Sequence, residues 1–192
     1  MSLDGANTEQ WLRSQSEADM GSRGERARFV RQLVGPQDGW FAFHDLLAKQ
    51  VVEEAGWCYI NGQFIGCVVL CQCFLENTFR GWLAMGGSSY GVTDEWIEKA
   101  GFYVLIEKAT EYGLVSPTEA GECHWLRKTR VGYVHHRPAW SDDHFARRMV
   151  QQNALPHELH QDDAERALEL ALNILRRDPW RIREESGDGQ SV

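Results

Sequence analysis

The feature that most constrains the fold is a segment, residues 62–85, that is apolar on nearly every side. Its run 68-VV-69 is compatible with a strand, but its length and the polar positions Glu76, Asn77 and Arg80 favour a helix. A helix that is apolar all round is normally the central helix of a domain. The unbroken run 64-FIGCVVLC-71 is far shorter than the roughly 20 residues of a membrane span. The segment therefore predicts the buried helix of a soluble bundle.

Apolar residues at helical spacing, bounded by capping and terminating residues, predict further helices around it. These helices cover about 24–34, 39–57, 93–113, 116–136, 142–152 and 162–177. Thr93 and Ser141 are expected N-caps, and Gly113 is an expected C-terminal glycine. The clearest local signal is 116-SPTE-119, a capping box with proline at the first helical position.

No segment alternates for long with the two-residue period of a strand, so we expect an all-α fold, in which five or six of these helices form the bundle. The length of 192 residues suits one domain. We expect a flexible N-terminal arm over 1–24, a single helical domain over 25–180 and a disordered tail over 181–192. The N-terminus has no apolar core of a signal peptide, which predicts a cytoplasmic protein without a membrane partner.

Charge is distributed unevenly along the chain. The formal net charge is −8, which argues against a protein that coats nucleic acid non-specifically. Residues 123–141 nevertheless contain no acid, and they hold four cationic side chains, Arg127, Lys128, Arg130 and Arg137. The five cysteines form no C-x-x-C pair and lie mostly in apolar surroundings, which suits reduced thiols. We expect no metal and no cofactor.

The acid-free stretch 124-HWLRKTRVGYVHHRP-138 is the last part of the helix that begins at 116-SPTE-119. A helix C-terminus stabilises positive charge, so a histidine there is suited to proton transfer. An arginine about one turn earlier can bind a phosphate with two hydrogen bonds. Arg130 and His135 are separated by five positions, about 140° apart on a regular helix, so convergence requires a long arginine and an unwinding helix end. Tyr133 lies between them and is a candidate for stacking on a base or donating its hydroxyl.

The stretch 114-LVSPTEAGECHWLRKTRVGYVHH-136, in an all-helical chain, resembles the Arg-x4–6-His motif of the HEPN superfamily. The matching residues are Arg130 and His135, and His136 gives the alternative six-residue spacing. Glu76, in 74-FLENTF-79, occupies the place where many members have an acid on the neighbouring helix. The resemblance covers about residues 39–177 and implies a HEPN-like helical bundle.

Many members of that superfamily are metal-independent endoribonucleases of toxin–antitoxin or antiviral systems, and they usually act as homodimers. The resemblance thus implies that Arg130 stabilises the phosphorane and that His135 is the general acid or base, with His136, Tyr133 and Glu76 in support. The implied partners are RNA or a nucleotide, a second copy of the chain, and an antitoxin or defence-system protein. Other members are catalytically inactive modules that bind nucleotides or proteins.

The sequence leaves alternatives to this interpretation open. Active members usually have a polar residue directly after the arginine, where this chain has Val131, which favours the inactive alternative. Glu76 is also placed to pair with Arg80 on its own helix. Arg130 and His135 also fit a solvated helix end that carries cations because the helix dipole favours them there.

Overall fold

The computed structural model describes residues 5–34, 40–42, 47–135, 138, 141, 144–177 and 181–183 of the chain. The fold is all-α, as the sequence predicted, apart from one short pair of strands. The described residues form eight α-helices, one 3₁₀ helix and two strands: α1 (Gly5–Val34), β1 (Trp40–Ala42), α2 (Ala48–Ile60), α3 (Phe64–Gly86), η1 (Gly87–Tyr90), α4 (Asp94–Lys99), α5 (Phe102–Glu111), α6 (Pro117–Val134), α7 (Phe145–Gln152), α8 (Pro156–Arg176) and β2 (Arg181–Arg183).

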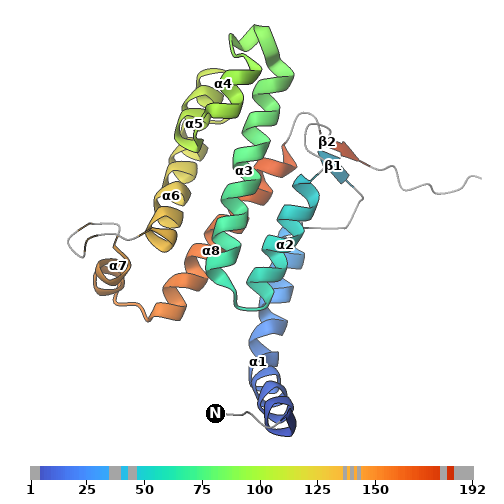
Figure 1. Ribbon diagram of the computed structural model, residues 1–192, viewed down its shortest axis with the longest axis vertical. Helices are drawn as coiled ribbons and strands as arrows, with labels where there is room; N and C mark the ends of the chain where they lie inside the picture. Colours follow the sequence, from blue (N-terminus) through green and yellow to red (C-terminus); the bar gives the residue numbers. More distant parts are fainter. Residues whose placement is uncertain are drawn as a thin grey trace, which may run out of the picture.

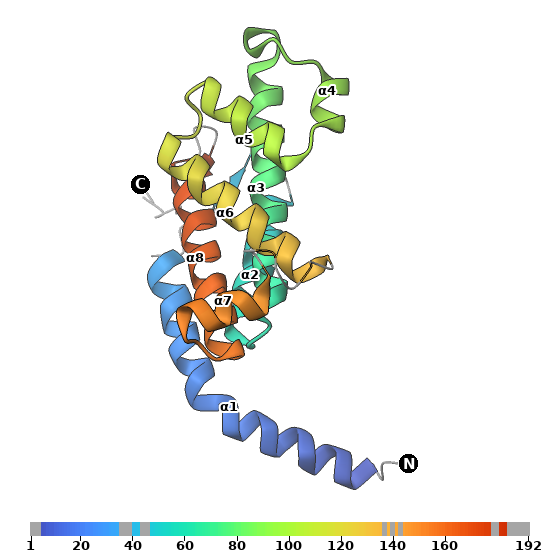
Figure 2. The same cartoon turned by 90° about the vertical axis from the view of Figure 1, so that its left-hand side faces the viewer.

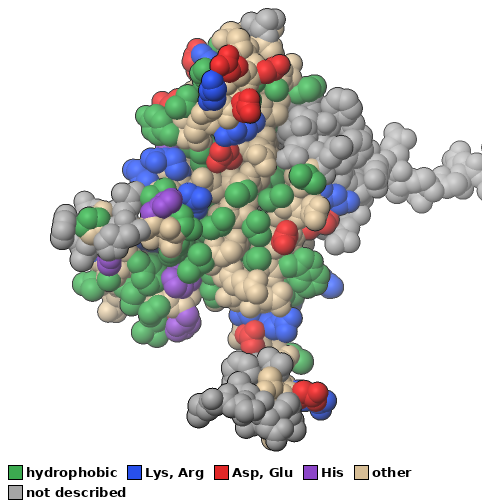
Figure 3. All heavy atoms as spheres, viewed as in Figure 1, with side chains coloured by type: hydrophobic (Ala, Val, Ile, Leu, Met, Phe, Trp, Pro, Cys, Tyr) green, Lys and Arg blue, Asp and Glu red, His purple; other side chains and the backbone are tan. Residues whose placement is uncertain are grey.

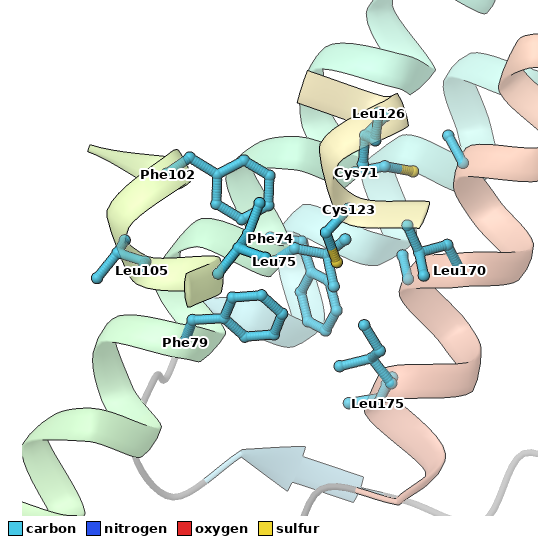
Figure 4. Close-up of a cluster of buried hydrophobic side chains, with 14 of the residues drawn as sticks. Cys71, Phe74, Leu75, Phe79, Phe102, Leu105, Cys123, Leu126, Leu170 and Leu175 are labelled. Atoms are coloured by element: carbon cyan, nitrogen blue, oxygen red, sulfur yellow. The ribbon is translucent and has the colours of Figure 1, made fainter. Parts of the chain in front are cut away.

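The apolar segment is the central helix of the bundle. It forms α3, which packs against α2, α5, α6 and α8 (Figure 1). Figure 4 shows the shared core, in which Phe74, Leu75 and Phe79 of α3 point between side chains of the surrounding helices. Phe102 comes from α5, and Cys123 and the other core residues of α6 and α8 close the far side. No described helix is both long enough and apolar enough to cross a membrane.

The capping residues expected from the sequence define α4 and α6. The Oγ of Ser116 accepts from the backbone N–H of Glu119 at 3.3 Å, and the Glu119 carboxylate accepts from the N–H of Ser116 at 2.9 Å. Thr93 caps α4 by accepting from the N–H of Trp96 at 3.2 Å. Gly113 adopts a positive φ of 68° just after α5, as expected of a C-terminal glycine. These signals are local, so they predict the structure without knowledge of the tertiary contacts.

The helix expected over 93–113 is divided into α4 and α5. The chain becomes extended at Ala100 and Gly101, where ψ is 126° and 160°. The Nη2 of Arg80, on α3, donates to the carbonyl oxygen of Ala100 at 2.7 Å. This side chain satisfies a backbone acceptor at the break between the two helices, which offsets the cost of interrupting a helix there.

Several boundaries differ from those expected. The second helix begins at Ala48, not near residue 39, and β1 precedes it. The first helix begins at Gly5 instead of near residue 24, and its N-terminal half projects beyond the bundle (Figure 1, Figure 2). The Nε of Arg26 anchors its other half by donating to the carbonyl of Ile60 at 2.9 Å. The expected tail contributes β2, which pairs with β1 in an antiparallel arrangement.

The last two helices also start at other residues than expected. α7 is capped by His144, whose Nδ1 accepts from the N–H of Ala146 at 3.2 Å, instead of by Ser141. α8 begins at Pro156, six residues before the expected start at Asp162, with proline in the first turn. His160 is consequently a helix residue that faces Tyr133 and Phe145. The early start of α8 therefore places His160 against Tyr133, in the last turn of α6.

Candidate functional site

The candidate site lies where α6 ends. The helix is regular through Val134, and His135 then turns to extended backbone with φ −125° and ψ 143°. The N–H of His135 still donates to the carbonyl of Val131 at 3.1 Å, so the chain leaves the helix directly at this residue. The change of backbone direction redirects the His135 side chain relative to a continued helix. It removes the 140° divergence that a regular helix would impose on residues five apart.

The structure brings Arg130 and His135 together. The Nη1 of Arg130 lies 3.4 Å from the Nε2 of His135, a long contact in which the guanidinium is the donor and the imidazole nitrogen the acceptor. Arg130 is partly buried and His135 is exposed. Both polar heads therefore face the same patch of solvent at the end of α6, in reach of a ligand that could insert between them.

No described carboxylate pairs with Arg130. Its described neighbours are His135 and the exposed thiol of Cys73 on α3. Desolvation and the carboxylate of Glu76 raise the pKa of Cys73, whereas the guanidinium of Arg130 lowers it. The Arg130 side chain thus reaches across to α3 and keeps its charge available for an anion.

Glu76, a predicted supporting residue, lies near this site but is engaged elsewhere. Its Oε1 accepts from the Nη2 of Arg80 at 2.7 Å, four residues later on α3. Arg80 in turn binds the carbonyl of Ala100 at the break between α4 and α5. Glu76 therefore forms the ion pair with Arg80 that the sequence suggested as the alternative to a role in the site. Its charge acts on the thiol of Cys73, and no described contact links it to His135.

Tyr133 does not join Arg130 and His135. Its hydroxyl donates to the Oδ2 of Asp163 on α8, and its ring packs against Phe145 and His160 with centroids 5.9 and 5.2 Å away. Burial and the hydrogen bond to Asp163 raise the pKa of Tyr133 well above its ordinary value. The Tyr133 ring is already packed against Phe145 and His160, so it does not fit the predicted stacking on a base. Its hydroxyl is engaged with Asp163, so it does not fit donation to a substrate either.

Sequence reasoning missed the cluster that surrounds Tyr133. Asp163 is 4% exposed and accepts two hydrogen bonds from Arg148 of α7, at 2.9 and 2.6 Å. Burial also lowers the pKa of His160, which stacks on Phe145. A signal was present in the sequence, because Asp163 lies on the apolar face of α8 between Leu159 and Ala167. An acid on an apolar helix face implies a buried partner.

Other candidates fall outside the site or outside the described residues. His136, the alternative to His135, lies outside the described part of the chain, as do Arg137, Trp140 and Asp142. The ring of Trp125 is covered by the guanidinium of Arg166, 4.0 Å from the ring centroid, so this face is not open to a base. Within the described residues, no group of histidine, cysteine or acidic side chains could hold a metal ion.

Basic and acidic side chains are distributed unevenly over the described surface. On the face shown in Figure 3, Lys, Arg and His side chains lie over α6, whereas many acidic side chains lie over α4 and the top of α3. A hollow of about 400 Å³ lies at α4 and the start of α5, lined by residues that include Trp96 and Val104, and not at the Arg130–His135 pair. His135 is exposed, so the pair lies at the surface of the molecule.

Comparisons with protein-family models, with curated proteins and with solved structures find no match for this chain. The residues and contacts of the chain itself are therefore the basis for assigning it a function.

Proposed function

We propose that this chain is a HEPN-like, metal-independent endoribonuclease that acts in the cytoplasm as an RNA-cleaving toxin or defence effector. The observation that carries the proposal is the convergence of Arg130 and His135, 3.4 Å apart, at an exposed helix end. Arginine binds phosphate oxygens in a bidentate manner, and histidine is the side chain best suited to move a proton near neutral pH. The two together form a minimal unit for phosphodiester chemistry.

In the proposed reaction, the guanidinium of Arg130 binds the non-bridging oxygens of an RNA phosphate. The ribose 2′-hydroxyl attacks phosphorus, and the bond to the 5′-oxygen breaks. The products are a 2′,3′-cyclic phosphate and a 5′-hydroxyl. The Nε2 of His135 takes the 2′-hydroxyl proton or, when protonated, supplies one to the leaving oxygen. Arg130 offsets the charge that accumulates on the phosphorane.

We include a homodimer in this proposal. Each chain contributes one Arg130–His135 pair, whereas full acid–base catalysis uses one group that accepts a proton and another that donates one. A second copy across a two-fold axis would supply the second histidine and the second cation. A partner protein, such as an antitoxin, would regulate the activity by covering this surface.

Specific observations favour a second candidate, a catalytically inactive HEPN-like module that binds a nucleotide or a protein. Val131 follows Arg130, and a valine cannot make the hydrogen bond that orients a substrate. The hydroxyl of Tyr133 is held by Asp163 and is not available to the site. In this case the Arg130–His135 pair would bind a phosphate without cleaving it.

The test is cleavage of labelled RNA by the purified protein in the presence of a chelator. We compare the wild type with Arg130→Ala and His135→Ala, and with Lys128→Ala as a control on the same helix. The proposal predicts that each site variant loses at least about 100-fold in rate, the usual contribution of acid–base or charge-stabilising groups, whereas Lys128→Ala retains its rate.

Equal background cleavage by all four proteins would exclude the ribonuclease. If that is the outcome, nucleotide binding measured with the same variants decides on the second candidate. Binding that depends on Arg130 and His135, but not on Lys128, would establish the inactive module.

A further inference from the structure

A second group of side chains lies beside the proposed site on the flank of α6 that faces α5. Tyr103 of α5 is 51% exposed, although α5 also contributes Phe102 and Leu105 to the core. The guanidinium carbon of Arg127 lies 5.4 Å from the centroid of its ring. The ring of His124 lies 5.1 Å away from the same centroid. The exposed ring of Tyr103 and the charge of Arg127 thus lie side by side on this flank.

Arg127 has charge and hydrogen-bonding capacity to spare. No described acid pairs with it, and its Nε has no hydrogen-bond partner although that atom is shielded from solvent. The nearby acid Glu107 is instead engaged with the Nε2 of His124 at 2.8 Å. The Nε itself is out of reach of a ligand, so a phosphate would bind the terminal Nη1 and Nη2 atoms of this guanidinium.

The position of Arg127 relates this group to the Arg130–His135 pair. Residues three apart on a helix are neighbours on one face, with Cβ atoms about 5–6 Å apart. Arg127 therefore lies one turn before Arg130, and Tyr103 extends the same surface onto α5. The ribbon views agree that α5 and α6 lie side by side here (Figure 1, Figure 2). Lys128 projects about 160° away from Arg130 around the helix and is outside this surface.

We propose that Tyr103 and Arg127 form a subsite for single-stranded RNA beside the Arg130–His135 pair. Arg127 binds the phosphate next to the one held by Arg130, and the adjoining base stacks on the exposed Tyr103 ring. Alternation of cations with an aromatic surface is the physical basis of binding to single strands, since every base has a face that can stack. The inference rests on the proposed function, and it assigns single-stranded, not double-stranded, RNA as the substrate class.

An acidic peptide is the competing ligand class. Its carboxylates would use Arg127, whereas the exposed part of the Tyr103 ring, beside Arg127 and His124, gives a base a stacking contact that a peptide would use little. The contributions of the two residues also differ in kind. A phosphate contact contributes through counterion release and changes the dependence of affinity on salt, whereas stacking does not.

The experiment measures binding of a fluorescent single-stranded RNA to the full chain over a range of salt concentrations. All proteins carry His135→Ala so that the RNA stays intact, and they differ by Tyr103→Leu, Arg127→Gln or the control Lys128→Gln. We expect Tyr103→Leu to weaken binding about 5- to 10-fold without a change in the salt slope. We expect Arg127→Gln to reduce the slope of log K against log salt by about 0.7, and Lys128→Gln to leave it unchanged.

The outcomes separate this subsite from the proposed cleavage. Affinity that is unchanged by Tyr103→Leu, or a salt slope equal in Arg127→Gln and Lys128→Gln, overturns the subsite even if Arg130 and His135 prove to be catalytic. If the wild type does not cleave RNA but binding still depends on Tyr103 and Arg127, the subsite is supported and the ribonuclease is excluded. Preference for an acidic peptide or for a duplex of the same sequence also overturns it.

Discussion

At the scale of single residues, the position of the Arg130 guanidinium over α3 can be tested through a neighbouring thiol. The charge of Arg130 lowers the pKa of Cys73, which desolvation and Glu76 raise. The thiolate is the reactive form, so replacing Arg130 by the neutral Gln should raise the pKa of Cys73 and shift its alkylation profile to higher pH. The expected loss at a fixed pH near 8 is about two- to fivefold in rate, the range for a surface charge pair.

Alkylation of Cys73 is measured by peptide mass spectrometry, because Cys67, Cys71 and Cys123 are buried and react slowly. Burial raises the pKa of Cys123 to about 12, which gives an internal reference for an unreactive thiol. The variant Lys128→Gln controls for net charge. A Cys73 profile that is identical in the wild type and Arg130→Gln would show that the guanidinium does not lie near this thiol.

Local geometry explains which of the expected site residues lie together in the structure. Arg130 and His135 come together because the chain leaves the helix at His135, close to residue 136, where the sequence predicts the helix to end. Tyr133 was assigned to the same site because it lies between them in sequence, but the helix turns it toward α8, where Asp163 holds its hydroxyl. That partner is 30 positions away, so the residues around Tyr133 do not reveal the contact, although an acid on the apolar face of α8 implies a buried partner of some kind.

At the scale of helices, the pair of Arg148 and Asp163 joins α7 to α8, and Tyr133 joins α6 to the same carboxylate. The side chains of Arg148 and Asp163 are only 15% and 5% exposed. Asp163→Ala would leave the arginine charge largely buried without its partner. We predict a loss of about 3–5 kcal/mol in the free energy of unfolding, measured by chemical denaturation.

Two of these helices, α6 and α8, offer a matched control. Glu122 accepts two hydrogen bonds from Arg166, at 2.7 and 2.9 Å, but these side chains are 37% and 47% exposed. Glu122→Ala should therefore cost less than about 1 kcal/mol, since solvent screens the pair. Losses of similar size for Asp163→Ala and Glu122→Ala would contradict the structural role assigned to the buried pair.

The helix boundaries show which interactions can be predicted from the sequence alone. Ser116 and Thr93 were identified as caps because a cap and its donors lie within one turn. The break between α4 and α5 was missed because the group that stabilises it, Arg80, comes from another helix. The start of α2 at Ala48 was likewise missed, since the β1–β2 pair joins segments about 140 positions apart.

At the scale of the molecule, the all-α fold could be predicted because one helix is apolar on nearly every side and requires neighbours around most of its surface. That helix is α3, and the core of Figure 4 forms around it. The arrangement of surface charge could be predicted only in part. The acid-free stretch was evident in the sequence, but the Tyr103–Arg127 surface joins α5 to α6 and depends on their packing.

The proposed function requires Arg130 and His135 to act as one unit on an RNA phosphate. A double-mutant cycle measures this coupling, by comparing the rate of RNA cleavage in chelator for the wild type, Arg130→Ala, His135→Ala and the double variant. Groups that act as a unit are strongly non-additive, so we predict that the double variant is no slower than the slower single variant. Losses that multiply independently, or a wild-type rate no higher than that of the double variant, would contradict the joint action of the two residues.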